Sequence, residues 1–325
     1  MKLLIPGGAG YIGSHFVRFA QNLGHEVVVL DNFSTGHNWA VSDCEVINVD
    51  LLDRDKLNIS LNGRRFDGVI HFAAKSLVNE SINRPLKYFR NNFEGTMNLV
   101  EVMMKNNIKN LVFSSTAAIF GNPIYKKINE DHPKNPINPY GSSKLIVEQM
   151  LEKVCLVSEF NACCLRYFNA AGADPSGEIG ECHNPETHLI PNVLMSCLPE
   201  GNGLKVYGDD YDTPDGTCIR DYIHVNDLAK AHLLGLEYIK KSKGFSAFNL
   251  GNGDGYSVLD VINTSRDLTG NPINFSFEER REGDPSVLIA DSSSAESNLG
   301  WKPQYTELAQ IISSAWTWHK QNIVK

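Results

Sequence analysis

Three groups of residues in this chain are of types that can move a proton and hold a dinucleotide. Tyr140 and Lys144 stand four residues apart, so on a helix they share one face. The cluster Ser114-Ser115-Thr116 lies upstream of them, and the chain opens with a glycine-rich turn over residues 7–13. Together, the three groups favour hydride transfer at a hydroxyl-bearing carbon with a bound nicotinamide.

The tyrosine needs help to act as a base, because its ordinary pKa is about 10. Lowering that pKa by about three units requires roughly 4 kcal/mol, which two nearby positive charges in a partly dry cleft can supply. Lys144 is one such charge and the nicotinamide ring is the other. Thr116 is placed to hydrogen-bond the reacting oxygen. Ser114 and Ser115 stay ambiguous, since polar residues are frequent at strand ends.

The glycine-rich turn has the spacing of a phosphate-binding loop. Gly7, Gly10 and Gly13 lie three apart between an expected strand and an expected helix. The first lets the chain turn, the second lets a pyrophosphate approach the backbone, and the third lets the helix pack on the strand. The helix N-terminus adds free N–H groups and a partial positive charge. A glycine turn alone is a weak signal, but here strand, glycines, helix, strand and acid follow in order.

Two aspartates that end strands indicate which dinucleotide binds. Asp31 ends the second strand, where a carboxylate accepts hydrogen bonds from a ribose diol and repels a 2′-phosphate. The segment 32–40 contains no arginine that would favour such a phosphate. The cofactor is therefore predicted to be NAD and not NADP. Asp50 ends the next strand and is placed to touch the adenine edge, although a solvated turn aspartate is the alternative.

The first half of the chain alternates short apolar runs with helical patterns. Strands are expected at 2–5, 26–30, 45–49, 68–72, 110–114 and 162–167, and helices at 13–23, 92–106 and 140–160. This alternation predicts an α/β fold with a Rossmann-type, doubly wound parallel sheet. Ligands bind such sheets at the carboxyl ends of the strands, where the motifs described above fall.

The second half of the chain differs from the first in composition and periodicity. Residues 169–218 are rich in Gly, Pro, Asn and Asp, which indicates loops and short elements over a ligand. Helices are expected at 227–238, 258–268 and 305–321, and a strand at 247–250 returns to the main sheet. The predicted organisation is a Rossmann domain over 1–168, with a returning segment near 221–250, and a smaller C-terminal α/β substrate-binding lobe over 169–325.

Composition excludes some classes of partner. A chain of 325 residues can bury a large core. Its net charge of −8 argues against a surface that binds nucleic acid. Its seven cysteines are scattered without Cys-x-x-Cys spacing, so we expect reduced thiols and no metal site. Neither a signal peptide nor an apolar run of about 20 residues is recognisable, so we expect a cytoplasmic protein without a membrane partner.

The motifs resemble those of the extended short-chain dehydrogenase/reductase family, and within it the UDP-sugar 4-epimerase branch. The similarity runs almost end to end and includes GGAGYIGSH at 7–15, FSSTAAIFG at 113–121, NPYGSSK at 138–144 and RYFNAAG at 166–172. The most discriminating stretch is YGDDYDTPDGTCIRDYIHV at 207–225. The glycine turn and the Tyr-x-x-x-Lys pair by themselves are typical only of the superfamily.

The resemblance implies three sets of functional residues. The catalytic set is Thr116, Tyr140 and Lys144. The implied NAD contacts are Gly7, Gly10, Tyr11, Ile12, Gly13, Asp31, Asn32, Ser34, Thr35, Gly36, Asp50, Leu51, Phe72, Ala73, Ala74, Ser76, Asn91, Ser114, Tyr140, Lys144, Tyr167 and Phe168. The implied UDP-sugar contacts are Thr116, Asn169, His188, Leu189, Val206, Tyr207, Arg220, Arg281 and Asp284.

Some of these positions carry a further argument. Arg220 and Arg281 can clamp a diphosphate, although a surface ion pair is the alternative for each. Ser76 stands where some family members have a lysine, and Lys75 precedes it. His188 stands where many relatives have asparagine. Leu288 aligns with a residue that limits room beside the second carbon of the sugar.

The resemblance implies an isomerase of galactose metabolism that interconverts UDP-galactose and UDP-glucose by transient oxidation at C4, with tightly bound NAD. It also implies a homodimer that pairs through the helices at 92–106 and 140–160. A 4-epimerase of UDP-N-acetylglucosamine or UDP-glucuronate is the main alternative. A dehydratase is disfavoured because Ala117-Ala118 follow Thr116 where dehydratases have an Asp-Glu pair. A non-catalytic NAD-binding protein would not need Thr116, Tyr140 and Lys144 together.

Overall fold

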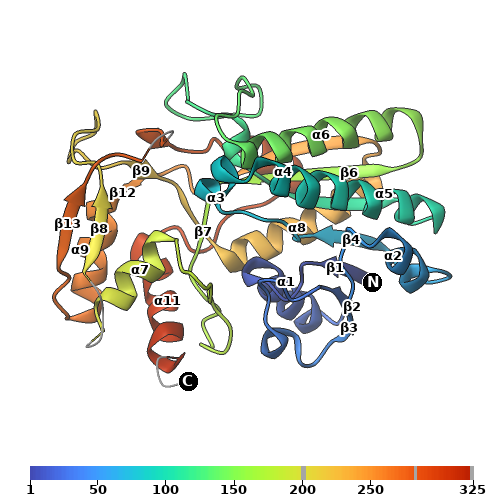
Figure 1. Ribbon diagram of the computed structural model, residues 1–325, viewed down its shortest axis with the longest axis horizontal. Coiled ribbons are helices and arrows are strands. Elements are labelled where there is room, and N and C mark those ends of the chain that lie inside the picture. The colour runs from blue at the N-terminus through green and yellow to red at the C-terminus, as the bar shows by residue number, and fades with distance from the viewer. Residues whose placement is uncertain (199–202, 282–283, 323–325) are drawn as a thin grey trace.

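A seven-stranded parallel sheet organises the molecule (Figure 1). The computed structural model describes residues 1–198, 203–281 and 284–322. The strand order is β11-β6-β5-β4-β1-β2-β3, and each pairing within this sheet is parallel. The strands are β1 (Lys2–Pro6), β2 (Glu26–Leu30), β3 (Glu45–Ile47), β4 (Gly68–His71), β5 (Asn110–Thr116), β6 (Asn161–Tyr167) and β11 (Phe245–Leu250). The predicted doubly wound sheet is confirmed, and its strand order reverses direction between β1 and β4.

Helices cover both faces of this sheet. On one face lie α1 (Tyr11–Asn22) and α8 (Val225–Lys241), and on the other lie α2 (Arg54–Leu61), α5 (Gly95–Lys105) and α6 (Pro139–Val157). Successive strand residues point to opposite faces, so Leu3 and Ile5 of β1 pack on the face covered by α1 and α8, and Leu4 packs on the opposite face. Both faces are buried, which is why these strands are almost continuously apolar.

Short elements connect the main ones. They are η1 (Asn38–Val41), α3 (Val78–Asn83), α4 (Pro85–Tyr88), the π-helical η2 (Phe89–Glu94) and η3 (Ala117–Ile119). The helix predicted at 92–106 is therefore an α-helix from residue 95, continuous with the π-helical turn before it. The strand predicted at 247–250 is β11, which pairs in parallel with β6 at the edge of the sheet.

The rest of the chain builds a second core beyond the carboxyl ends of the strands. Its elements are β7 (Asn169–Ala171), α7 (Leu189–Ser196), β8 (Leu204–Tyr207), β9 (Ile219–Arg220), β10 (Tyr222–His224), β12 (Tyr256–Ser257), α9 (Val258–Thr269), β13 (Phe275–Glu278), β14 (Val287–Leu288) and α11 (Leu308–Asn322). Helix α10 (Ser293–Leu299) instead packs Ala295 and Leu299 into the main-sheet core beside α8. Its strands form the small sheets β10-β7, β12-β9-β14 and β13-β8. Helices α9 and α11 were predicted, whereas the strands are too short for sequence periodicity to reveal.

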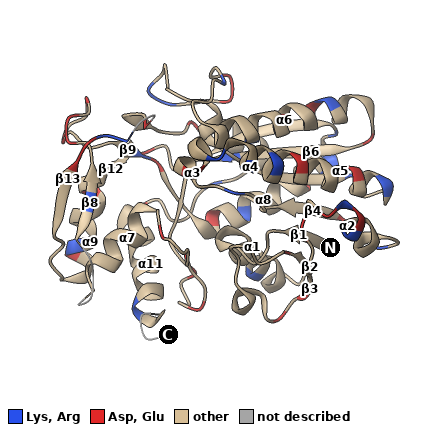
Figure 2. Cartoon of the chain, viewed as in Figure 1, with Lys and Arg blue, Asp and Glu red and all other residues tan. Residues whose placement is uncertain are grey.

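Charge and cysteines follow the expectations from composition. Figure 2 shows acidic and basic residues interspersed over the helices and loops, in keeping with a mixed, moderately acidic surface. All seven cysteines are free. Among the described residues, none of the helices combines the length and apolarity needed to cross a bilayer.

A buried ion pair fastens α6 to the sheet, and its loss should be costly. Glu148 on α6 and Arg166 on β6 lie 2.7 Å apart with both side chains almost fully buried. We expect Glu148→Ala to lower the free energy of unfolding by about 3–5 kcal/mol, because it leaves the guanidinium buried and unpaired. Urea unfolding measures this. The matched control is Glu152→Ala on the exposed face of the same helix, which should stay within about 0.5 kcal/mol of wild type.

Candidate active site

A cavity of about 1340 Å³ lies at the carboxyl ends of the main strands and extends under the second core. Its wall takes residues from the glycine turn, from the ends of β2, β4, β5 and β6, and from β8, β9 and β14. All the predicted cofactor and substrate residues line it except Ser114. The structure thus brings together positions that are spread over most of the chain.

The glycine turn is shaped as expected for a phosphate cradle. Gly7 has a φ of +79°, and a Cβ there would lie 2.3 Å from the backbone nitrogen of Ala73. A Cβ at Gly13 would lie 2.1 Å from the carbonyl oxygen of Gly7. At Gly10 the nearest atom would be 3.5 Å away, so that side of the turn is open. Gly10 gives α1 no side-chain cap, which leaves N–H groups at the helix start for an anion.

Two carboxylates beside the turn are held by backbone and side-chain donors. Asp31 is buried and accepts hydrogen bonds from the N–H groups of Ala9 (3.0 Å) and Phe33 (2.9 Å). Burial raises the pKa of Asp31, and these hydrogen bonds act against that rise. Asp50 accepts from the side chain of Asn32 at 2.7 Å. Both carboxylates are thereby oriented at the end of the cavity where a ribose and an adenine were predicted.

Lys75 and Ser114 depart from their expected places. Lys75 lines the cavity, and its Nζ donates to Ser34 Oγ at 3.1 Å, although it was not among the predicted contacts. Ser114 lies behind the wall, where its Oγ is 3.1 Å from His232 Nε2. The carbonyl of Ser114 accepts from Lys144 Nζ at 2.8 Å. Ser114 therefore positions the lysine through its carbonyl, and its predicted cofactor contact stays a prediction.

Two adjacent elements present the catalytic set. Asn138 caps α6 by accepting from the N–H of Gly141 at 2.8 Å, and Pro139 begins the helix. This start places Tyr140 in the first turn and Lys144 one turn later. Thr116 ends β5 and is the N-cap of η3. Its Oγ1 accepts a hydrogen bond from the N–H of Ala118 at 3.1 Å.

Burial changes the acidity of both partners. It raises the pKa of Tyr140 above its ordinary value, against the effect of a hydrogen bond with Thr116. Burial lowers the pKa of Lys144 to about 7, because the charged ammonium is costly to desolvate. The protein groups alone therefore keep the phenol protonated. The expected phenolate requires the second positive charge, and the lysine by itself is not enough.

The far end of the cavity carries the two arginines. Arg220 on β9 is buried, forms an ion pair with Asp284, and donates to the carbonyl of Ile219 at 2.7 Å. The guanidinium of Arg281 lies 4.0 Å from the ring centroid of Tyr207. Leu288 pairs with Arg220 across β14 and β9 and also lines the cavity. Arg220 therefore forms an ion pair, as the alternative interpretation expected, but this pair lines the cavity and does not lie on the outer surface.

A cluster near the glycine turn was not predicted, and its residue types bear on the expectation of no metal site, which stays a prediction. Glu181, His183, Glu186 and His188 present ligand-type atoms that all lie within 4.8 Å of one another. The signal was present as Glu-x-His-x-x-Glu-x-His at 181–188, but the expectation rested on cysteine spacing alone. Burial opposes charge on His183, yet hydrogen bonds to the two glutamates outweigh it and raise its pKa to about 10.

Gly7 provides a direct test of the cradle. We expect Gly7→Ala to abolish dinucleotide binding and to destabilise the protein, because a side chain at this φ would clash with the backbone after β4. Absorbance and mass spectrometry of the denatured protein would measure the cofactor released. The matched control is Gly63→Ala, also at positive φ (+72°) but with no atom within 4 Å of its Cβ. Full cofactor content in Gly7→Ala would contradict the cradle.

Comparisons with known proteins agree with this geometry. A model of the NAD dependent epimerase/dehydratase family matches residues 3–251. The UDP-glucose 4-epimerase of Halalkalibacterium halodurans is 48% identical over 99% of this chain and 96% of its own length. That of Lacticaseibacillus casei is 46% identical over 99% and 98%.

Solved structures are equally similar. UDP-glucose 4-epimerase from Brucella ovis in complex with NAD gives a TM-score of 0.94 at 45% identity and covers 97% of each chain. The enzyme from Bifidobacterium longum, in complex with NAD+ and UDP, gives 0.94 at 38% identity and covers 99% of each chain. The UDP-Glc/GlcNAc 4-epimerase from Campylobacter jejuni gives 0.87 at 40% identity, covering 98% of this chain and 99% of its own. The chain therefore belongs to the NAD dependent epimerase/dehydratase family.

Proposed function

We propose that this protein is a UDP-glucose 4-epimerase, which interconverts UDP-galactose and UDP-glucose by transient oxidation at C4 with a tightly bound NAD. The observation that carries this proposal is a single cavity that Thr116, Tyr140 and Lys144 line together with the glycine turn and the two arginines. The glycine turn lies at one end of it and Arg220 and Arg281 at the other. Relatives that are UDP-glucose 4-epimerases match almost the whole chain.

The two ligands are assigned to different parts of the chain. We infer that residues 1–168, with the returning segment near 221–250, hold NAD, and that residues 169–325 hold the UDP-sugar. The open side of Gly10, the helix start after it and the oriented Asp31 fit a pyrophosphate and a ribose diol. When bound, NAD accepts hydride from C4 of the sugar and returns it.

Tyr140 moves the proton. Its phenol oxygen accepts the proton of the sugar 4-hydroxyl and later returns it, while Thr116 holds the same oxygen in line. Lys144, kept in place by the carbonyl of Ser114, contributes positive charge beneath the pair whenever it is protonated. Ala117 and Ala118 follow Thr116 in η3, so the acid and base that water elimination requires are missing from that position.

Inversion of the configuration at C4 requires tight binding of the diphosphate and weak binding of the sugar. Arg220 and Arg281 are placed to hold the diphosphate through charge-assisted hydrogen bonds. The 4-keto sugar can then rotate about its bond to the diphosphate and present its other face. Arg220 is already ordered by Asp284, which limits the entropy lost when the substrate binds.

A second substrate is favoured by one observation. Leu288 lines the cavity, and the resemblance implies that it stands where residue size limits the room beside the second carbon of the sugar. The relative from Campylobacter jejuni is described as a UDP-Glc/GlcNAc 4-epimerase. A 4-epimerase that also accepts N-acetylated sugars is therefore the second candidate.

We further propose a homodimer in the cytoplasm that serves galactose metabolism. Helices α5 and α6 carry exposed apolar side chains, namely Met104, Ile146, Leu156 and Val157. Such residues on neighbouring helices suit a helical interface between two copies. Sedimentation equilibrium tests the dimer, and a monomer at micromolar concentration would contradict it.

The decisive assay uses the purified protein without added NAD. UDP-galactose, UDP-N-acetylgalactosamine and UDP-galacturonate are incubated separately, and the products are resolved by chromatography. Conversion of UDP-galactose to UDP-glucose is expected, and it would also demonstrate that NAD stays bound through purification. Turnover of the N-acetyl sugar alone would replace the first proposal with the second. No turnover of any of the three, by a protein that carries NAD, would contradict both.

A further inference from the structure

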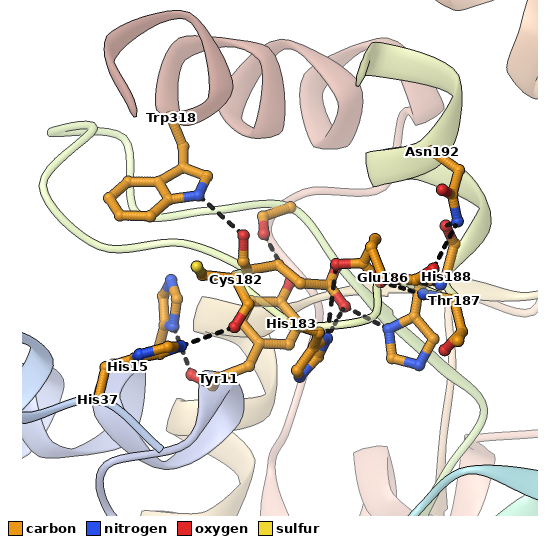
Figure 3. Close-up of polar contacts among 12 residues, drawn as sticks. Tyr11, His15, His37, Cys182, His183, Glu186, Thr187, His188, Asn192 and Trp318 are labelled. Atoms are coloured by element: carbon orange, nitrogen blue, oxygen red, sulfur yellow. Dashed lines mark hydrogen bonds and ion pairs between the residues drawn. The ribbon is translucent and has the colours of Figure 1, made fainter. Parts of the chain in front are cut away.

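The segment that joins β7 to α7 concentrates potential metal ligands at one point. Glu181, His183, Glu186 and His188 fall within eight residues, and their ligand-type atoms lie within 4.8 Å of one another. Figure 3 shows His183, Glu186 and His188 turned toward one another on this segment. Two imidazoles and two carboxylates form the ligand type that Zn²⁺ and similar borderline metals accept, whereas Ca²⁺ and Mg²⁺ prefer oxygen alone.

The distances suit a tetrahedral ion. With metal–ligand bonds of about 2.0 Å, the ligand atoms of a tetrahedral site lie about 3.3 Å apart. Nδ1 of His183 lies 3.2 Å from Oε1 of Glu181 and 3.6 Å from Oε2 of Glu186. Nδ1 of His188 is in direct hydrogen-bond contact with Oε1 of Glu181. This last pair must open for an ion to enter, and the remaining pairs, all within 4.8 Å, must close to about 3.3 Å.

The surrounding contacts hold the ligands as supporting groups do in metal sites. Oε1 of Glu186 accepts from the N–H groups of Thr187 (2.7 Å) and His188 (2.9 Å), which leaves Oε2 free to face His183. The carbonyl of Glu181 accepts from the indole N–H of Trp318 on α11 at 2.9 Å. The Glu181 side chain is about 96% buried, so its carboxylate is desolvated unless a cation or a protonated histidine compensates it.

We propose that Glu181, His183, Glu186 and His188 form a four-ligand structural site for one divalent transition-metal ion of the Zn²⁺ type. Four protein ligands close the coordination sphere, so the ion has no open position for chemistry. Its effect is to pin the segment against the glycine turn. The ring of Tyr11 lies 6.2 Å from that of His183, and its hydroxyl donates to the carbonyl of Gly172 at 2.5 Å. The ion fastens the wall beside the phosphate cradle.

Metal content tests the proposal independently of catalysis. The purified full-length protein is stripped with a chelator, given one equivalent of Co²⁺, and followed by visible spectroscopy. We expect the intense absorption bands of tetrahedral Co²⁺, then their loss on addition of one equivalent of Zn²⁺ but not of Mg²⁺. Elemental analysis after gel filtration should find about one zinc ion per chain.

Variants locate the ion. His183→Ala and Glu186→Gln each remove one ligand outside the predicted substrate contacts, and we expect zinc affinity to fall by about 100-fold or more. Cys182→Ser is the matched control, since this exposed thiol lies within the same segment and is not part of the cluster. It should keep the wild-type affinity. Circular dichroism and bound NAD would verify that each variant is folded.

Several results would overturn the site. Wild-type protein that shows no tetrahedral Co²⁺ spectrum and retains no zinc excludes it without any variant. Equal zinc affinity in wild type, His183→Ala and Glu186→Gln excludes these ligands, and loss of zinc in Cys182→Ser alone assigns the ion to the thiol. In each of these cases the two histidines and two glutamates form a metal-free ion network. Metal binding by an enzyme that fails the epimerase assay would leave this site intact and remove only the proposed function.

Discussion

Tyr140→Phe should lower kcat by about 10²–10⁴-fold while the protein folds normally and keeps its NAD. The substitution removes one oxygen and leaves the ring that packs in the first turn of α6. Loss of that oxygen removes the proposed acceptor for the proton of the sugar 4-hydroxyl. Initial rates with UDP-galactose, bound NAD and the melting temperature, measured on one preparation, check all three expectations.

The control for this prediction is Tyr125→Phe. Tyr125 is 62% exposed, and it does not line the cavity. Its variant should match wild type in rate and cofactor content. Wild-type turnover in Tyr140→Phe would remove the proposed base. A folded variant that had lost NAD would instead assign the tyrosine to binding.

Lys144→Met should also abolish most turnover, and it should change how stability depends on pH. The lysine is almost completely buried, and burial lowers its pKa to about 7 from an ordinary value near 10.5. Between these two values the unfolded chain binds a proton that the folded protein does not. The stability that Lys144 contributes is therefore fully present above about pH 10.5 and is lost as pH falls toward 7. Each unit of that pKa difference corresponds to about 1.4 kcal/mol.

Methionine fills a similar volume and carries no charge, so the variant lacks this slope. We expect Lys144→Met to be more stable than wild type near pH 7 and the difference to shrink toward pH 10, with both proteins at the same NAD content. Urea unfolding at several pH values measures the effect. Lys153→Met, on the exposed face of the same helix, should show the wild-type slope. Parallel slopes in wild type and Lys144→Met would show that the ammonium is not desolvated.

The main sheet could be predicted from sequence because its signals are local. Apolar runs such as Glu26–Leu30, followed by an acid or glycines, report strands buried on both faces, and Asn138-Pro139 marks the start of α6. The proximity of the three proposed catalytic residues was predictable for the same reason. Tyr140 and Lys144 share a helix, and Thr116 ends a strand that pairs directly beside β6.

Other features depend on contacts that no local pattern encodes. Strands β9, β12 and β14 contain two residues each and exist because Arg220, Tyr256 and Leu288 meet across long loops. The direction of the Ser114 hydroxyl, for example, is set by His232 on α8, more than a hundred residues away. The pKa of Tyr140 was predicted from the charges of Lys144 and the nicotinamide ring, whereas burial of the phenol is the largest influence that the protein itself exerts on it.

The return of the chain to the main sheet through β11 limits how this protein can be divided. A fragment that stops at residue 168 would lack both β11 and α8, which would uncover the edge of β6 and one apolar face of the sheet. Unpaired edges of this kind promote aggregation. Insoluble expression of the 1–168 fragment is therefore expected, and a soluble, monomeric fragment would argue otherwise. Because the two halves are interleaved along the chain, recombination cannot exchange the half proposed to bind the sugar as a separate unit. Specificity would then evolve by point changes and loop insertions within that half.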